Sequence, residues 1–429
     1  MLAATWPQKC IYYWLLLLTA LLPIDEQVTM LLLVPCFVLG LAVAFWRRRQ
    51  PRKNVLPRAL QVALYLLLLA AYYSLHNSAD TAQSTYNFMY VVGSYCMYAW
   101  LLVRFGLGEG PAEPFAWHKP QFWPRPLQLI MVVMLVGCGE ALYGIVQHFT
   151  GVIPTDPWVD AEVFPELKTR IVGTLVNPNI FAGYLVLLFS FALAFAHNVQ
   201  ERRLKCVFAV AALLYLAALL YTFSRGNWVA VAAVACGYGL LFARRWLWPM
   251  LACGAVGLFL ARGVVWQRLA SILSTEDTSV ALRFAYLEST LFIIREHPWG
   301  VGWFGFQFVY PEYDFYLNNP AVIMYHCHNL LLNVTAELGV QGLICFVAVV
   351  GGFAYYACKL NKTAQAPWLK AIAQGYLAAL IGIFVGGLTD YVYFNQKMGL
   401  LFWLLSMLVL LACAYNAFVL RAKNTFVDN

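Results

Sequence analysis

One stretch of this chain, HCHNLLLNVTAELGVQG at residues 326–342, concentrates polar side chains within an otherwise strongly apolar sequence. If a helix begins at Asn329, then Asn329, Asn333 and Glu337 recur every four residues and form one polar stripe. His328 falls at the first turn of that helix. A free histidine titrates near pH 6.5 and can accept a proton from a reacting hydroxyl. A structural histidine is the commoner case, and spacing alone leaves both interpretations open.

Arginines supply the second set of chemically capable residues. Arg225 lies in the segment TFSRGNW between two apolar runs, with almost no loop between them. An arginine at a membrane boundary either extends its charge to the interface or pairs with an anion. Arg170 and Arg283 are expected on the same side of the membrane, and guanidinium groups bind phosphate oxygens in pairs of hydrogen bonds. The sequence therefore predicts an anionic ligand.

Two acidic residues lie near or within apolar segments. Glu140 is expected at membrane depth, with Tyr143 and Gln147 on the same helix face. It is either a functional group or a polar clamp between helices. Asp390 follows another apolar run, and we expect it to pair with a basic neighbour.

Composition identifies the class of protein. Of the 429 residues, 62% are hydrophobic and 11% are charged. Soluble domains carry roughly 25% charged residues, so this is a polytopic, all-α integral membrane protein. The net charge of +8 does not indicate nucleic-acid binding, because the basic residues gather at the ends of apolar segments. The eleven cysteines show no CxxC spacing and are interpreted as small apolar residues.

Hydropathy predicts about 12 transmembrane helices. They are roughly 11–24, 28–46, 60–75, 88–107, 127–150, 180–197, 206–223, 228–242, 246–261, 338–360, 371–388 and 398–420. The excess of lysine and arginine in alternate connections predicts that both termini are cytoplasmic.

This reading divides the chain into four parts. Residues 1–150 hold transmembrane helices 1–5, and residues 151–262 hold helices 6–9 with an outer loop at 151–179. Residues 263–338 form a large periplasmic loop with short helices, and residues 339–429 hold helices 10–12. Gly339 and Gly342 are expected to let helices approach closely.

The order of four motifs resembles the O-antigen ligase family, which also includes O-antigen polymerases. The first motif is His328-Asn329 followed, after nine residues, by Gly339-Val340-Gln341-Gly342. The others are Ser224-Arg225-Gly226, Arg283 before the segment 296–302 (EHPWGVG), and Arg170 leading to Asn177-Pro178-Asn179. The resemblance covers roughly residues 170–360.

The resemblance implies a GT-C-like glycosyltransferase of the bacterial inner membrane, acting at its periplasmic face. It would move O-antigen polysaccharide from undecaprenyl diphosphate to a sugar hydroxyl of lipid A–core oligosaccharide, with inversion at the anomeric carbon. His328 would be the catalytic base. Arg225 and Arg283, with Arg170 as a third, would bind the diphosphate. Asn329, Glu337 and Asn177 would support the site or orient the acceptor, with helix packing the alternative for Glu337.

The resemblance also implies no cofactor and no metal, although Asp156 and Asp160 keep a metal alternative open. The expected partners are the lipid-linked glycan donor, the lipid A–core acceptor and membrane lipids. The nearest alternative is an O-antigen polymerase with the same chemistry and another repeat unit as acceptor. A protein O-glycosylating ligase and a bicarbonate-type solute transporter are further alternatives.

Overall fold

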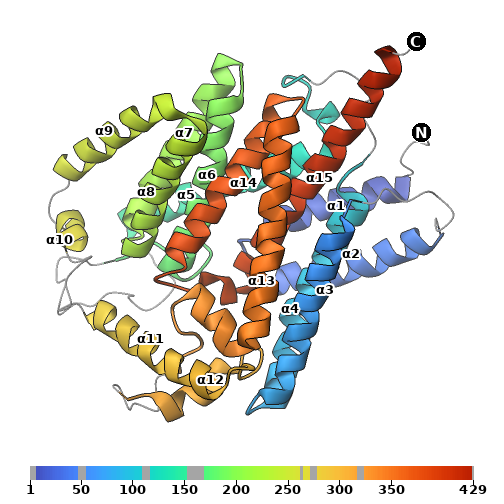
Figure 1. The fold of residues 1–429 in the computed structure, drawn as a ribbon. Coiled ribbons are helices and arrows are strands. Elements are labelled where there is room, and N and C mark those ends of the chain that lie inside the picture. The colour runs from blue at the N-terminus through green and yellow to red at the C-terminus, as the bar shows by residue number, and fades with distance from the viewer. Residues whose placement is uncertain are drawn as a thin grey trace.

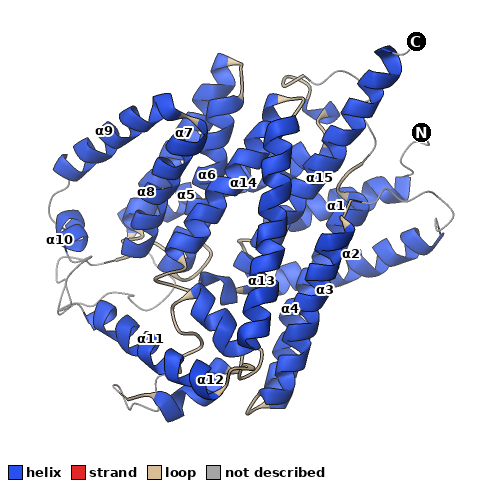
Figure 2. Cartoon of the chain, in the orientation of Figure 1, coloured by secondary structure: helices blue, strands red, loops and turns tan. Residues whose placement is uncertain are grey.

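In the computed structural model the described part of the chain is helical, joined by loops and short 3₁₀ turns (Figures 1 and 2). The structure describes residues 6–46, 55–108, 116–151, 169–260, 264–270, 278–315 and 323–427. The helices are α1 (Trp6–Leu21), α2 (Glu26–Trp46), α3 (Arg58–Ser74), α4 (Thr81–Phe105), α5 (Arg125–Thr150), α6 (Pro178–Asn198), α7 (Arg202–Tyr221), α8 (Arg225–Phe242), α9 (Arg244–Leu260), α10 (Val264–Ala270), α11 (Thr278–Glu296), α12 (Phe306–Val309), α13 (Leu330–Thr363), α14 (Pro367–Gly386) and α15 (Gln396–Val427).

Each of the twelve apolar segments expected from hydropathy lies on a helix. Within the described residues, nine helices are long and apolar enough to cross a membrane. They are α2 to α7 and α13 to α15. The other three expected spans fall on α1, α8 and α9, of 16, 18 and 17 residues. The chain is therefore a multi-pass membrane protein with these nine candidate spans.

Helix α6 forms the centre of the bundle, because its neighbours bury it on all sides. Its most extensive packing is against α14 and α7. Two glycines on α14 permit this close approach: a Cβ at Gly375 would lie 2.8 Å from Phe191, and one at Gly382 would lie 2.6 Å from Val186. Small residues at such contacts are typical of helix packing in membranes. A rigid centre of this kind holds the outer end of α6 in place.

Helix α13 is broken at Gly339, whose φ of 74° and ψ of 177° are not helical. The break frees the carbonyls of Ala336 and Glu337, which accept hydrogen bonds from Val301 N–H (2.8 Å) and Gly302 N–H (3.0 Å). The expectation that Gly339 lets two helices approach is wrong. Its left-handed backbone instead lets the segment 298–302 dock onto the kink.

Helices α11 and α12 lie at one end of the bundle, at the bottom of Figure 1, while the C-terminus lies at the other end. The first turns of α6, α8 and α13 and the last turn of α14 share the end that carries α11. The segments next to these helix ends therefore lie at the same end of the protein.

Candidate functional site

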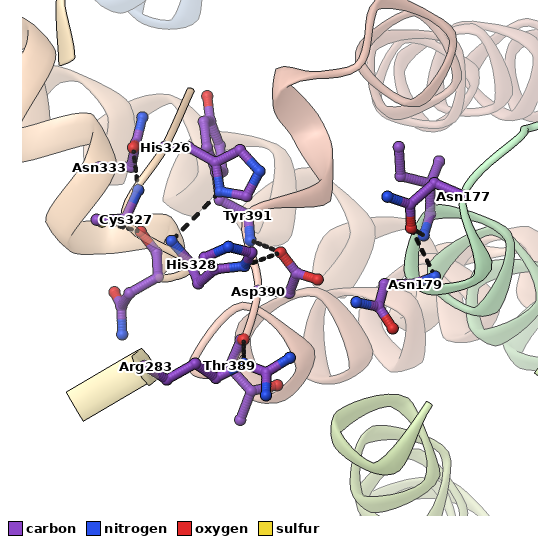
Figure 3. A network of polar contacts seen from close by, with 12 residues as sticks. Asn177, Asn179, Arg283, His326, Cys327, His328, Asn333, Thr389, Asp390 and Tyr391 are labelled. Atoms are coloured by element: carbon purple, nitrogen blue, oxygen red, sulfur yellow. Dashed lines mark hydrogen bonds and ion pairs between the residues drawn. The ribbon is translucent and has the colours of Figure 1, made fainter. Parts of the chain in front are cut away.

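His328 and Asp390 form the centre of the site (Figure 3). His328 Nδ1 lies 3.0 Å from Asp390 Oδ1, and the same oxygen accepts the backbone N–H of Tyr391 at 2.8 Å. Asp390 follows α14, whereas His328 precedes α13. The ring of Tyr286, from α11, stacks on the His328 ring with centroids 5.6 Å apart. The expectation that Asp390 pairs with a basic neighbour is confirmed, and His328 is that neighbour.

The Asp390 carboxyl is held in its ionised form. Burial would raise its pKa, but the charge and hydrogen bond of His328, together with the charges of His326 and Arg283, hold the pKa of Asp390 well below its ordinary value. A carboxylate at Nδ1 accepts the proton of that nitrogen. Whenever the His328 ring is neutral, its free lone pair is therefore on Nε2, which is the arrangement of an oriented general base.

The arginines predicted from the sequence converge beside this pair. Arg283 donates through Nε to the carbonyl of Thr389, the residue before Asp390, at 2.9 Å. Arg170 donates through Nε to the carbonyl of Thr222 (2.8 Å) and through Nη2 to Asn179 Oδ1 (2.9 Å). These hydrogen bonds hold both guanidinium groups in place relative to the neighbouring backbone.

Burial lowers the pKa of Arg170, the positive charges of Arg268, Arg283 and Arg225 lower it as well, and Asp390 acts in the opposite direction. The resulting pKa is about 9. Arg170 remains charged at neutral pH. We call these four residues the arginine cluster: Arg170, Arg225, Arg268 and Arg283. So many positive charges within electrostatic reach of one another favour an anionic ligand.

Three helix N-termini reinforce this positive potential. Asn177, Ser224 and Asn329 are the N-cap residues of α6, α8 and α13. Each follows a non-glycine residue with left-handed backbone: Val176, Phe223 and His328, with φ of 64°, 52° and 55°. Such a conformation costs about 1–2 kcal/mol per residue and is often found at functional sites. Helix N-termini carry partial positive charge and attract anions.

Gly226 explains how α8 reaches the site. A Cβ at this position would lie 2.1 Å from Thr389 Oγ1. Only a glycine therefore lets the start of α8 contact the segment that holds Thr389 and Asp390. This contact places Arg225 one residue from the close approach to Thr389, whose carbonyl accepts the Arg283 hydrogen bond.

The supporting residues fall into two groups. The Asn177 side chain caps α6, and the Asn329 side chain caps α13 through Leu332 N–H (3.0 Å) and reaches the carbonyl of Leu388 (3.3 Å). Glu337 is buried and accepts hydrogen bonds from the backbone N–H groups of Phe304 and Phe306. Its carboxyl group thus holds the segment near α12, which agrees with the packing alternative.

Glu140 has an equally clear set of partners. Its carboxylate accepts the hydroxyl (2.8 Å) and the backbone N–H (3.1 Å) of Thr174. Gln147, two turns later, accepts Val172 N–H and Gly173 N–H. Tyr143 is 46% exposed and does not share this face, contrary to expectation. The buried stripe of α5 is a polar clamp that holds residues 172–174, and thereby the segment between Arg170 and Asn177.

Sequence reasoning missed three members of the site. The sequence pattern assigns no role to Arg268 or to Tyr286. Asn179 lay within a quoted motif without a role; here it accepts from Arg170 and from Ser224 Oγ (3.0 Å).

One group of metal-binding side chains occurs in the described residues. Ligand atoms of His326, His328 and Asp390 lie within 4.8 Å of one another. The positive charge of Arg283 acts on both His326 and Asp390, which disfavours a divalent cation. Asp156 and Asp160, the metal alternative from the sequence, lie outside the described residues.

Fold and site together define a multi-pass helical membrane protein with a cationic site at one face. Residues 210–347 match the family model of the O-antigen ligases, so the chain carries a domain of that family over about a third of its length. The domain implies lipid-linked glycan transfer of the ligase or polymerase type. The matched segment holds Arg225, Arg268, Arg283 and His328, whereas Arg170 and Asp390 lie outside it. No curated protein matches the sequence.

Proposed function

We propose that this protein is an O-antigen ligase that transfers polysaccharide from undecaprenyl diphosphate to a sugar hydroxyl of lipid A–core oligosaccharide. The observation that carries the proposal is the His328–Asp390 pair at the edge of the arginine cluster. It combines a positioned base with a site for a diphosphate, and the family domain supplies the class of substrate.

In the proposed reaction, the acceptor hydroxyl oxygen attacks the anomeric carbon of the donor sugar. His328 Nε2 takes the hydroxyl proton as the new C–O bond forms. The bond between the anomeric carbon and the diphosphate oxygen breaks on the opposite face, so the configuration inverts. Its electron pair passes to the leaving diphosphate. General-base assistance of this kind typically contributes about 10²- to 10⁴-fold.

Arg170, Arg225 and Arg283 stabilise the charge that develops on the leaving group, with Arg268 as a fourth contributor. Positive groups held in place before the reaction act without reorganisation during it. The helix N-termini of α6 and α8 add to the same field. We therefore propose a metal-independent enzyme without a cofactor. Excess EDTA is expected to leave the purified enzyme active, and inhibition that Mg²⁺ reverses would contradict this.

An apolar cavity of about 360 Å³ supports lipid substrates. It lies between α3, α4, α13 and α15, and its lining includes Leu330, Trp303 and Tyr391. Leu330 begins α13 and Tyr391 follows Asp390, so the cavity reaches the site. A hydrocarbon chain in this cavity would hold a lipid head group near His328.

The proposed enzyme is GT-C-like and lies in the bacterial inner membrane, with both termini cytoplasmic and the site facing the periplasm. Deletion in the native host, followed by gel analysis of lipopolysaccharide and carrier-linked glycan, tests the proposal. Long polymer on the lipid carrier together with bare core is the expected result. Single repeat units on the core would indicate a polymerase instead. Unchanged glycans with lost solute uptake would reject the enzyme in favour of a transporter.

A further inference from the structure

His326 is buried directly beside His328 and contacts its backbone. The His326 side chain is 8% exposed, and its ring centroid lies 4.4 Å from that of His328. His326 Nδ1 accepts the backbone N–H of His328 at 3.3 Å (Figure 3). The His326 ring also packs on the ring of Phe394, with centroids 4.3 Å apart, and this contact helps to hold it in place.

The backbone that His326 contacts is the left-handed one. His328 has φ of 55°, which side chains other than glycine rarely adopt. This conformation turns the chain from the segment before residue 328 into the N-cap at Asn329. It also places the His328 ring between Tyr286 and Asp390. A conformation of this kind persists only where the surroundings hold it.

We propose that His326 is a positioning residue, which accepts the His328 N–H and so holds His328 in the left-handed conformation that keeps its ring against Asp390. This inference rests on the proposed role of His328 as the base. His326 itself does not touch the reacting atoms.

The protonation state of His326 suits this task. Burial lowers the pKa of His326, the charges of His328 and Arg283 lower it as well, and Asp390 opposes them, so the resulting pKa is about 3. The ring is therefore neutral at physiological pH. With its proton on Nε2, the lone pair on Nδ1 is free to accept the backbone N–H.

A matched pair of amide variants isolates the Nδ1 contact. In His326→Asn the amide oxygen can occupy the position of Nδ1, whereas in His326→Gln the amide reaches the position of Nε2. We expect His326→Asn to keep kcat within about threefold of wild type and His326→Gln to lower kcat about 10- to 100-fold. The KM for the donor is expected to change less than twofold in both. Equal kcat values in the two variants, or a loss confined to KM, would overturn the proposal.

A third variant separates positioning from packing. His326→Phe keeps an aromatic ring against Phe394 but has no acceptor atom. We expect its thermal midpoint to stay near that of wild type while its kcat falls as in His326→Gln. A fall in kcat that follows the loss of thermal stability across the series would indicate a packing role and reject the proposal.

A structural readout distinguishes failure of this inference from failure of the proposed function. In a structure of His326→Gln we expect His328 to leave the left-handed region and the His328–Asp390 distance to exceed hydrogen-bond range. An unchanged 3.0 Å pair would reject the positioning role, whatever the activity. Transfer by His328→Ala is measured in parallel: full activity there would reject the base, and with it the catalytic consequence of His326.

Discussion

His328 Nδ1 lies 3.0 Å from Asp390 Oδ1, although 62 residues separate them in the chain. Between them the chain runs through all of α13 and α14, away from the site and back. The pair therefore depends on the packing of α13 against α14 and on the kink at Gly339. The same packing places Thr389 where Arg283 and Gly226 meet it.

Asp390→Asn tests the orientation of the base. The amide carries no charge and can donate as well as accept, so it no longer selects the tautomer with a free Nε2. We expect kcat for glycan transfer to fall about 10²- to 10⁴-fold with normal membrane insertion. Asp80→Asn is the matched control, because Asp80 accepts Gln83 N–H as the N-cap of α4 and asparagine also caps helices. Activity near wild type in Asp390→Asn would remove Asp390 from the mechanism.

Arg283→Gln tests the arginine cluster. The variant loses one positive charge beside the leaving group, and we expect kcat/KM to fall about 10²- to 10³-fold. Arg295→Gln, in the exposed last turn of the same helix, is the control and is expected to lose less than twofold. Inorganic diphosphate is expected to inhibit wild type more strongly than Arg283→Gln. Equal inhibition of both proteins would contradict a diphosphate site at Arg283.

Gly226→Ala tests the contact between α8 and Thr389. The added Cβ would lie 2.1 Å from Thr389 Oγ1, so either the Thr389 side chain or the start of α8 with Arg225 must shift. We expect at least tenfold lower transfer and a lower thermal midpoint. Gly139→Ala is the matched control in a helix, because a Cβ there meets nothing within 4 Å. Full activity in Gly226→Ala would show that the close approach is not required.

The stability of the protein is expected to fall in mild acid because of His326. Its pKa is about 3 in the folded protein against an ordinary value of 6.5, so the unfolded chain takes up the proton first as pH falls. Stability is then lost progressively below about pH 6.5, by about 2 kcal/mol at pH 5. Thermal melting in lipid nanodiscs between pH 7.5 and pH 5 measures this loss. The asparagine of His326→Asn does not titrate in this pH range, so we expect its thermal midpoint to change less with pH than that of wild type. The same pH dependence in both proteins would contradict a buried, neutral His326.

Several features of the fold and the site could be predicted because their signals are local. Every apolar segment expected to be a span lies on a helix, because a long apolar run is recognisable without its neighbours. The helix expected from Asn329 begins at Leu330, directly after it, and Asn329 caps that helix. The role predicted for Gly339 was wrong, because a glycine between two helical segments is compatible both with close helix packing and with a kink.

Other features required long-range information. Glu140 and Gln147 were recognised as polar residues in a span, but their partners at 172–174 lie on a different segment. The Glu337 carboxylate turns toward Phe304 and Phe306, which spacing along one helix cannot reveal.

By itself, the sequence determined that this protein spans the membrane and that a helix follows Asn329, and it predicted that Arg170, Arg225 and Arg283 lie on one side of the membrane. Hydropathy, helix capping and charge bias depend on residues that are close together in the sequence, so they can be recognised without the tertiary structure. Only the tertiary structure decided that the arginine cluster, His328 and Asp390 meet, and that His326 contacts the backbone of His328. Those contacts depend on how α6, α8, α11, α13 and α14 pack against one another, and packing joins residues that no local pattern connects.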